Sequence, residues 1–394
     1  MQHLLPPLRL VGATVLRDGV MQRRSVAIAD GRITRGPLPE VDLTGYLVLP
    51  GIIDLHGDGF ERHIQPRTGV SFDLAGALRS AAREIAGCGI TTAWLAQGWS
   101  WEGAHRSPEA AEALLAAHDR LRGSFGSDIR VQLRAEVHLT DDTARLIAAV
   151  RRFGVDFVIF NDHLAEGRAM QARRPADFAL WARKLGRDPA DLGASLDAAE
   201  ARAADVPRHL CSLGEAFDEL RVAYGSHDDP DGETRERYSM IGARIAEFPT
   251  SRVAAAAAKA MGSPVLMGAP NVVRGRSASG NVAAEALIAE RLCDALVSDY
   301  HYPALPQAAF ALVDRGLCSL PEAWAMISTA PANILRLHDR GRIEPGLRAD
   351  LAIVNAATRE IEATIAGGRM AYLSGEVACR FLYAPQPLLQ MAAE

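Results

Sequence analysis

The sequence predicts an α/β protein, in which a (β/α)8 TIM-like barrel carries a small β-sandwich domain formed by the N- and C-terminal segments. Short apolar stretches alternate with Ala-rich helical patterns from residue 51 to about 338, and turn-bounded strands lie on both sides of this region. Eight such alternations over roughly 290 residues match the strand count and length of a barrel. We therefore expect residues 51–338 to form the barrel and residues 1–50 and 339–394 to form one composite β domain.

The first 50 residues have the pattern of short strands joined by tight turns. Leu8–Leu16, Ser25–Ala29 and Leu47–Leu49 are apolar, and Asp18-Gly19 and Asp30-Gly31 are turn signals between them. The C-terminal segment returns to this pattern, with turns around residues 344–346 and 367–368. Since both ends are β-rich, we expect them to pair with each other.

The predicted barrel strands are short and apolar and end at glycine, proline or charged residues. Helices are expected between them, for example at Leu74–Ala86, Pro108–Leu121 and Val253–Ala260. The expected strands are Ile52–His56, Thr91–Leu95, Arg130–His138, Phe157–Phe160, Arg221–Gly225, Arg244–Phe248, Val265–Gly268 and Ala295–Ser298.

Composition excludes several classes of protein. The chain of 394 residues is 48% hydrophobic and has a formal net charge of −5, which argues against a nucleic-acid surface. No apolar run is long enough to cross a membrane, and the N-terminus lacks a signal-peptide pattern. The five cysteines are dispersed without a C-x-x-C pair, as is typical of reduced thiols. We expect a cytoplasmic protein with a small-molecule partner and no nucleic acid or membrane; a homo-oligomer stays open.

Arginine supplies nearly all of the positive charge. Among 43 basic residues, only Lys184 and Lys259 are lysines, and neither ends a predicted strand. A GC-rich genome would explain this bias. Its consequence still holds, because guanidinium groups bind phosphate in bidentate fashion.

Polar side chains collect at the ends of the predicted strands, which is where barrel enzymes place their chemistry. His56 and Asp58 are two residues apart and leave the first strand side by side. An imidazole beside a carboxylate suits a divalent metal, although each residue alone is more typical of a strand that ends in a polar turn. The other strand-end candidates are Gln97, Glu136, His138, Asn161, Asp162, His163, His227, Asp228, Asp229, Glu247, Asn271, Arg274 and Asp299.

With these residues the sequence resembles the amidohydrolase superfamily of metal-dependent hydrolases. This resemblance rests on the motif Pro50–His56 and on Asp299, which follows the last predicted strand. More specific stretches resemble the alpha-D-ribose 1-methylphosphonate 5-triphosphate diphosphatase family of the carbon–phosphorus lyase pathway. The sequence departs from that pattern at Gly57 and Gly59, where Thr and Asn are expected, and at His301-Tyr302. The specific stretches are Glu61–Val70, Ser226–Asp229, Glu247–Thr250, Met267–Gly275, Ser277, Ser279–Asn281 and Ser298–Tyr300.

The resemblance implies a hydrolase that cleaves a phosphoanhydride bond and releases pyrophosphate. Hydrolysis of a C–N bond, as in a deacetylase or cyclic amidase, and a metal-binding scaffold without catalysis are the alternatives. We expect one or two divalent ions, zinc or else manganese, with Asp299 as proton acceptor. Glu136 is expected to replace the carbamylated lysine of many relatives. The expected ligands are His56, Asp58, Glu136, His163, His227 and Asp299.

The loop after the seventh strand, residues 268–281, has the composition of an anion site. Glycines allow close backbone approach, and a helix expected at Val282–Glu290 would point its first N–H groups at the ligand. A Gly/Ser-rich surface loop with a solvated arginine is the alternative. The expected substrate contacts are His63, Arg67, Asn271, Arg274, Ser277 and Asn281.

Overall fold

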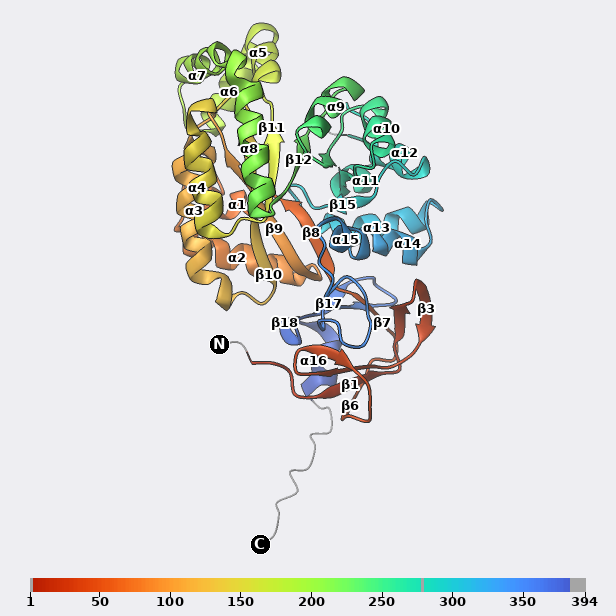
Figure 1. Cartoon of the computed structure of the whole chain (residues 1–394). Coiled ribbons are helices and arrows are strands. Elements are labelled where there is room, and N and C mark those ends of the chain that lie inside the picture. Colours follow the sequence, from red (N-terminus) through yellow and green to blue (C-terminus); the bar gives the residue numbers. More distant parts are fainter. Residues whose placement is uncertain (1–2, 278–279, 383–394) are drawn as a thin grey trace.

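Eight parallel strands form the centre of the molecule and curve into a nearly closed barrel, which confirms the predicted fold class (Figure 1). The computed structural model describes residues 3–277 and 280–382. Each barrel strand pairs with the next one along the chain. The strands are β8 (Ile52–Gly57), β9 (Ile90–Trp99), β10 (Asp128–Glu136), β11 (Phe157–Asn161), β12 (Ala223–His227), β13 (Ile245–Glu247), β14 (Val265–Gly268) and β15 (Ala295–Val297).

A short seam closes the barrel between its first and last strands. Gly57 and Asp299 form an isolated parallel bridge, in which Asp299 N donates to the His56 carbonyl at 2.9 Å. One level deeper, the fully buried Asp54 carboxylate accepts from the backbone N and the hydroxyl of Ser298, at 2.9 and 2.6 Å. The seam thus holds residues from β8 directly against residues that follow β15.

Some strand ends differ from the predictions for local reasons. β9 runs ten residues to Trp99, four beyond the predicted end at Leu95, because its whole length is buried on both faces. β12 begins at Ala223 and not at Arg221, since Arg221 caps the preceding helix in a left-handed conformation with φ 58°. β12 also ends two residues later than predicted, so His227 is the last residue of the strand instead of following it.

The predicted Ala-rich helices form and pack around the barrel. Asp73 caps α2 by accepting from Gly76 N, and Ser107 caps α3 by accepting from Ala110 N. The helices of the barrel region are α1 (Glu61–Ile64), α2 (Leu74–Gly87), α3 (Pro108–Leu121), α4 (Thr143–Phe153), α5 (Leu164–Arg173), α6 (Pro175–Lys184), α7 (Pro189–Ala201), α8 (Val206–Leu220), α9 (Gly232–Met240), α10 (Arg252–Ala260), α11 (Ala269–Arg274), α12 (Ala284–Ala289), α13 (Ala304–Asp314), α14 (Leu320–Ala325) and α15 (Thr329–Ile334).

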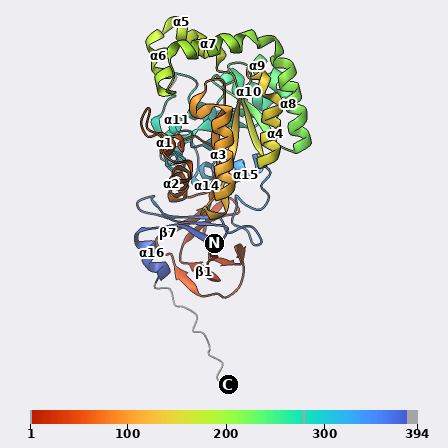
Figure 2. The ribbon, with the colours of Figure 1, turned by 90° about the vertical axis from the view of Figure 1, so that its left-hand side faces the viewer.

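Helices α5–α7 form a cap at the end of the barrel that lies away from the β domain (Figures 1 and 2). They have a small core of their own, which includes Phe178, Leu192 and Leu196 and also Trp101 from the loop after β9. This packing holds the β9 loop against the inserted helices, next to the carboxyl ends of β9, β10 and β11.

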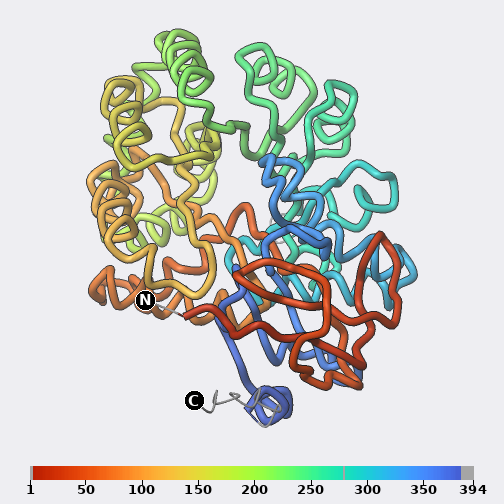
Figure 3. Tube along the Cα trace, turned by 60° about the horizontal axis from the view of Figure 1, so that its bottom comes forward, coloured from red at the N-terminus to blue at the C-terminus, as the bar shows by residue number. Residues whose placement is uncertain are grey.

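The terminal segments build a two-sheet β domain, as predicted (Figure 3). β7 pairs with β16 in antiparallel fashion, which joins the two ends of the chain in one sheet of order β18-β17-β16-β7-β2-β3. A second sheet of order β5-β4-β1-β6 shares its core with the first. The elements are β1 (Leu8–Val11), β2 (Thr14–Arg17), β3 (Val20–Arg23), β4 (Val26–Ala29), β5 (Arg32–Thr34), β6 (Glu40–Asp42), β7 (Tyr46–Pro50), β16 (Leu351–Asn355), β17 (Ile361–Ala366), β18 (Arg369–Leu373) and α16 (Gly375–Leu382).

The single strand expected at Leu8–Leu16 is two strands, one in each sheet. Gly12 separates them with φ 77°, and a Cβ there would lie 2.4 Å from the Thr44 hydroxyl oxygen. The predicted domain boundaries at residues 50 and 339 stay a prediction, and residues 383–394 lie outside the described part. Across the described residues, no helix combines the length and apolar character needed to cross a membrane.

Candidate active site

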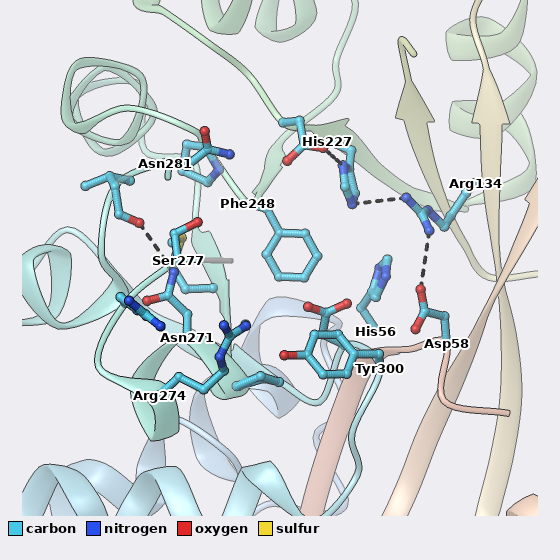
Figure 4. A pocket seen from close by; sticks show the side chains of 18 of the residues that line it. His56, Asp58, Arg134, His227, Phe248, Asn271, Arg274, Ser277, Asn281 and Tyr300 are labelled. Atoms are coloured by element: carbon cyan, nitrogen blue, oxygen red, sulfur yellow. Dashed lines mark hydrogen bonds and ion pairs between the residues drawn. The ribbon is translucent and has the colours of Figure 1, made fainter. Parts of the chain in front are cut away.

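A cavity of about 320 Å³ opens at the carboxyl ends of the barrel strands (Figure 4). One side carries the strand-end residues His56, Asp58, His227 and Asp299. The other side is formed by residues of the segment after β14, within 268–277 and 281–282. The structure thus brings four of the six predicted metal ligands together in one cavity.

His56, Asp58 and Asp299 offer one ligand atom each, all within 4.8 Å of one another. The ring of His56 is oriented by a buried carboxylate, since its Nδ1 lies 2.9 Å from Glu247 Oε2. Gln132 Nε2 in turn donates to Glu247 Oε1 at 3.1 Å. Because Nδ1 is engaged, Nε2 is the nitrogen left for an ion, an arrangement common around protein metals. Burial lowers the pKa of His56, but Glu247 outweighs this and leaves the pKa raised.

Arg134 lies between two of the predicted ligands. Its Nη1 is 3.6 Å from Asp58 Oδ2, and its Nη2 is 3.4 Å from His227 Nε2 (Figure 4). Arg134 is not among the site residues predicted from the sequence. The spacing in the sequence could have indicated it, because Arg134 and Glu136 are two residues apart on β10 and their side chains therefore point to the same side of the strand.

Glu136 and His163 meet in a second group, which also contains Glu102. His163 Nδ1 contacts Glu136 Oε1 directly and lies 3.5 Å from Glu102 Oε1. Trp101 Nε1 donates to the other Glu136 oxygen at 3.1 Å. Burial lowers the pKa of His163, but the two glutamates outweigh it and raise the pKa to about 10. Glu102 was missed because β9 was predicted to end too early.

The donor chemistry of both groups fits a divalent ion. Imidazole and carboxylate ligands suit zinc and manganese alike. Glu136 Oε1 and His163 Nδ1 are buried and lie against each other, and both are atoms that can ligate such an ion. Lys184 ends α6, and Lys259 of α10 pairs with Asp294 at 2.6 Å, so neither lysine ends a strand. Any bridge between ions would therefore come from a carboxylate.

Asp299 is placed by the seam and opens onto the cavity. Its backbone has φ 55°, and its N–H is held by the carbonyl of His56. Burial and the nearby Asp58 charge raise the pKa of Asp299 to about 6. A carboxylate of this kind is still ionised at neutral pH and can accept a proton.

Four of the predicted substrate contacts line the cavity: Asn271, Arg274, Ser277 and Asn281. Asn271 also has a structural role, because its Oδ1 accepts from Ala284 N at 3.1 Å. The predicted extent of the following helix, Val282–Glu290, is wrong, because the structure has the shorter α12 there. The N–H of Ala284, at the start of α12, already donates to Asn271 Oδ1. The neighbouring Ser279 lies outside the described residues.

Two predicted contacts lie elsewhere. His63 Nε2 pairs with Glu84 Oε2 at 2.8 Å, and Arg67 forms an isolated bridge with Val70 at the surface. Neither is among the described residues that line the cavity. Their assignment as substrate contacts stays a prediction. In the structure, the polar partner of the His63 ring is Glu84.

The cavity is rich in guanidinium groups although the chain is acidic overall. Arg106 and Arg134 lie on the strand side, and Arg274 and Arg276 lie on the opposite wall. Arg106 and Arg276 are additions to the predicted set. Asp58, Asp228 and Asp299 line the same cavity, and Arg106 and Arg134 are ion-paired with Glu102 and Asp58. Arg274 and Arg276 are therefore the guanidinium groups best placed to hold a polyanion.

The family model described as "Amidohydrolase family" matches residues 61–378, and the chain belongs to this family. It is 32% identical over 349 residues to the alpha-D-ribose 1-methylphosphonate 5-triphosphate diphosphatase of Escherichia coli (strain K12), covering 86% of this chain and 92% of that protein.

Solved structures share the fold at lower identity. A putative prolidase from Bifidobacterium longum has a TM-score of 0.64 at 15% identity, and covers 97% of this chain and 100% of its own. The N-acetylglucosamine-6-phosphate deacetylase from Pasteurella multocida has a TM-score of 0.60 at 12% identity, with 92% and 99% covered. These likenesses concern the fold, and they agree with the barrel and flanking β domain described above.

Proposed function

We propose that this protein is a metal-dependent hydrolase that cleaves a phosphoanhydride bond of alpha-D-ribose 1-methylphosphonate 5-triphosphate and releases pyrophosphate, in phosphonate catabolism. The observation that carries the proposal is the pair of arginines, Arg274 and Arg276, on the wall of the cavity opposite the candidate ligands. A triphosphate bears several negative charges, and guanidinium groups are the side chains best suited to bind them. The relative from Escherichia coli, named for this activity, supports the same substrate class.

Each part of the cavity has a task in this reaction. Arg274 and Arg276 grip the phosphates on the wall formed after β14, and Asn281 adds an amide beside them. Arg134 lies on the other wall, where its charge can offset the charge that develops on the attacked phosphoryl group. Asp299 accepts the proton of the attacking water and later returns it to the leaving group.

One or two divalent ions would be held by His56, Asp58, Glu136, His163, His227 and Asp299. When bound, such an ion lowers the pKa of water and polarises a phosphoryl oxygen. Glu247 fixes the ring orientation of His56 through the 2.9 Å contact to Nδ1. Asp54 precedes His56 on β8, and its buried carboxylate accepts a hydrogen bond from the Ser298 hydroxyl, which holds β8 against the last strand.

Hydrolysis of a C–N bond is the alternative, because the same fold serves both chemistries. A neutral amide would gain little from these arginines, whereas a polyanion needs them. This difference in charge separates the two functions.

The test is a product assay on the purified protein with zinc or manganese. Ribose 5-triphosphates with and without the methylphosphonate group are compared with a panel of amides and cyclic amides. Pyrophosphate release that exceeds phosphate release supports the proposal. Turnover of an amide together with inert triphosphates would refute it.

A further inference from the structure

Two adjoining hollows on the β domain are lined by arginines, and no carboxylate of the described residues lines either of them. Their volumes are about 480 and 910 Å³, and they share part of their walls. The β domain lies at the end of the barrel away from the cap, and the hollows have no lining residue in common with the active-site cavity (Figure 1). The arginines that line the hollows are Arg9, Arg17, Arg23, Arg24 and Arg35.

The fold gathers these arginines where the chain crosses between the two sheets. Residues 12–13 connect β1 to β2, and residues 24–25 connect β3 to β4, so each connection passes from one sheet to the other. Arg9 lies on β1 in one sheet, and Arg23 ends β3 in the other. A ligand in the hollows would therefore contact guanidinium groups from both sheets.

Most of this positive charge has no ionic partner within the protein. No carboxylate of the described residues forms an ion pair with Arg23, Arg24 or Arg35, and all three side chains are exposed. Arg9 and Arg17 each have a carboxylate nearby, at 3.6 and 3.7 Å. A cleft lined by charges of one sign concentrates ions of the opposite sign. The hollows thus have the electrostatic character of an anion site.

The arginine-rich composition does not by itself explain this arrangement. Asp58 and Asp299 accompany the arginines of the active-site cavity, and Glu102 and Asp177 line the cavity at α5 and α6. A general replacement of lysine by arginine would leave carboxylates beside the arginines in every cavity. The hollows of the β domain lack them.

We propose that these hollows bind a condensed phosphate, of which pyrophosphate is the smallest, at a site separate from the active site. Guanidinium groups bind phosphate oxygens in bidentate fashion, and a chain of phosphates can contact several of them at once. Thr14, Ser25 and Thr34 also line the hollows, and their hydroxyl groups can donate to phosphate oxygens.

The surroundings favour a small polyanion over a nucleic acid or a protein. Asp18 and Glu40 stand at the edge of the hollows through their contacts with Arg17 and Arg9, and they would repel a polyanion that continued past the edge. Protein interfaces centre on large side chains such as Trp, Tyr and Arg that fill a partner's pocket. Tyr46 lines the smaller hollow but is buried.

The test is a calorimetric titration of the full-length, metal-loaded protein with pyrophosphate. Because a pyrophosphate can also enter the active site, variants identify the β-domain site. Arg23→Ala/Arg24→Ala should bind one pyrophosphate fewer than wild type, or bind it at least about tenfold more weakly, with unchanged turnover. Arg274→Ala should keep this binding event. Arg151→Ala/Arg152→Ala, an adjacent exposed pair on α4, is the matched control and should bind as wild type does.

Hydrogen–deuterium exchange locates the bound anion. Pyrophosphate should protect peptides that span residues 12–13 and 24–25 in wild-type protein and not in Arg23→Ala/Arg24→Ala. Orthophosphate should bind at least about tenfold more weakly, because one phosphate reaches fewer guanidinium groups. ADP carries the same two phosphates on a nucleoside. ADP that binds as tightly as pyrophosphate assigns the site to the phosphate tail of a nucleotide, and weaker binding assigns it to free condensed phosphate; both results support the proposal.

Unchanged pyrophosphate binding in Arg23→Ala/Arg24→Ala overturns the proposal. So does protection confined to the active-site segments, equal binding of orthophosphate, or the same loss of binding in Arg151→Ala/Arg152→Ala. None of these outcomes depends on which bond the enzyme cleaves, so a failure here leaves the proposed hydrolysis untouched.

Discussion

The ring of Tyr302 fills the space that a side chain at residue 57 would need. A Cβ built on Gly57 lies 2.6 Å from Tyr302 Cε1, and one on Gly59 lies 3.1 Å from Cε2 of the same ring. Tyr302 is fully buried. Gly57, Gly59 and Tyr302 all depart from the family pattern that the sequence resembles. The three departures have one common explanation, because the two glycines leave the space that the ring of Tyr302 occupies.

Gly57→Ala should therefore destabilise the protein by about 1–3 kcal/mol, because it overpacks a closed site. In a Tyr302→Leu background, which itself contains a cavity, Gly57→Ala should cost less than in the wild-type protein; the Asp54 and Ser298 side chains, 2.8 Å from the new Cβ, limit this reduction. Urea unfolding measures both. Gly123→Ala, with open space around its Cβ, is the control and should change stability by less than about 0.5 kcal/mol. Equal effects at Gly57 and Gly123 would contradict the packing argument.

Replacing Asp299 by Asn should abolish most turnover while the protein keeps its metal. Asn cannot accept the proton of the attacking water, and a lost general base typically costs about 10²–10⁴ in kcat. Its remaining amide oxygen can still bind an ion. Steady-state kinetics and metal analysis on the same preparation test this. Full activity in Asp299→Asn would exclude the general-base role.

Arg274→Ala should raise the KM for a triphosphate substrate about tenfold or more. A hydrogen bond to a charged group contributes ~1.5–3 kcal/mol, and because Arg274 is exposed the effect should lie at the lower end. Activity on any neutral ester should change little. Arg151→Ala, on the exposed outer face of α4, serves as the control. An unchanged KM for every phosphorylated substrate would show that the anion site lies elsewhere.

His209 should make the protein less stable as the pH falls. Burial, and then His138, lower the pKa of His209 to about 4. The unfolded chain binds a proton at His209 below about pH 6.5, whereas the folded chain does not. This stability is therefore complete above pH 6.5 and is lost between pH 6.5 and 4, by ~2 kcal/mol at pH 5 and by ~3 kcal/mol at pH 4.

His209→Gln should remove this contribution. The difference in unfolding free energy between about pH 8 and about pH 5, from urea titrations, should shrink by ~2 kcal/mol. His338→Gln, which changes an exposed histidine, should leave the difference as in wild type. The same difference in all three proteins would rule out His209 as the source.

The fold was predictable because its signals are local. Alternating apolar stretches marked all eight barrel strands, and turn pairs such as Asp30-Gly31 marked the terminal β segments. Strand ends were less accurate. Burial on both faces extends β9 to Trp99, and a residue pattern gives no warning of where such a strand stops.

The candidate site was predictable where residues end strands and less so where they come from within strands or loops. His56 and Asp299 follow the rule for barrel enzymes. Arg134 lies inside β10, and Glu102 comes from a loop held by the inserted helices, so their positions depend on packing between distant segments. His63 shows the reverse case, because a residue within a specific motif pairs with Glu84 on α2.

The seam between β8 and β15 has a consequence for the synthesis of the protein. Asp54 and Ser298 are 244 residues apart in the chain, so the ribosome releases His56 and Asp58 long before Asp299 exists. A chain that ends before Asp299 has two members of the group formed by His56, Asp58 and Asp299, and it lacks the proposed proton acceptor. The last strand thus closes the barrel and completes the candidate catalytic group in one event, and we expect a chain truncated before it to be inactive.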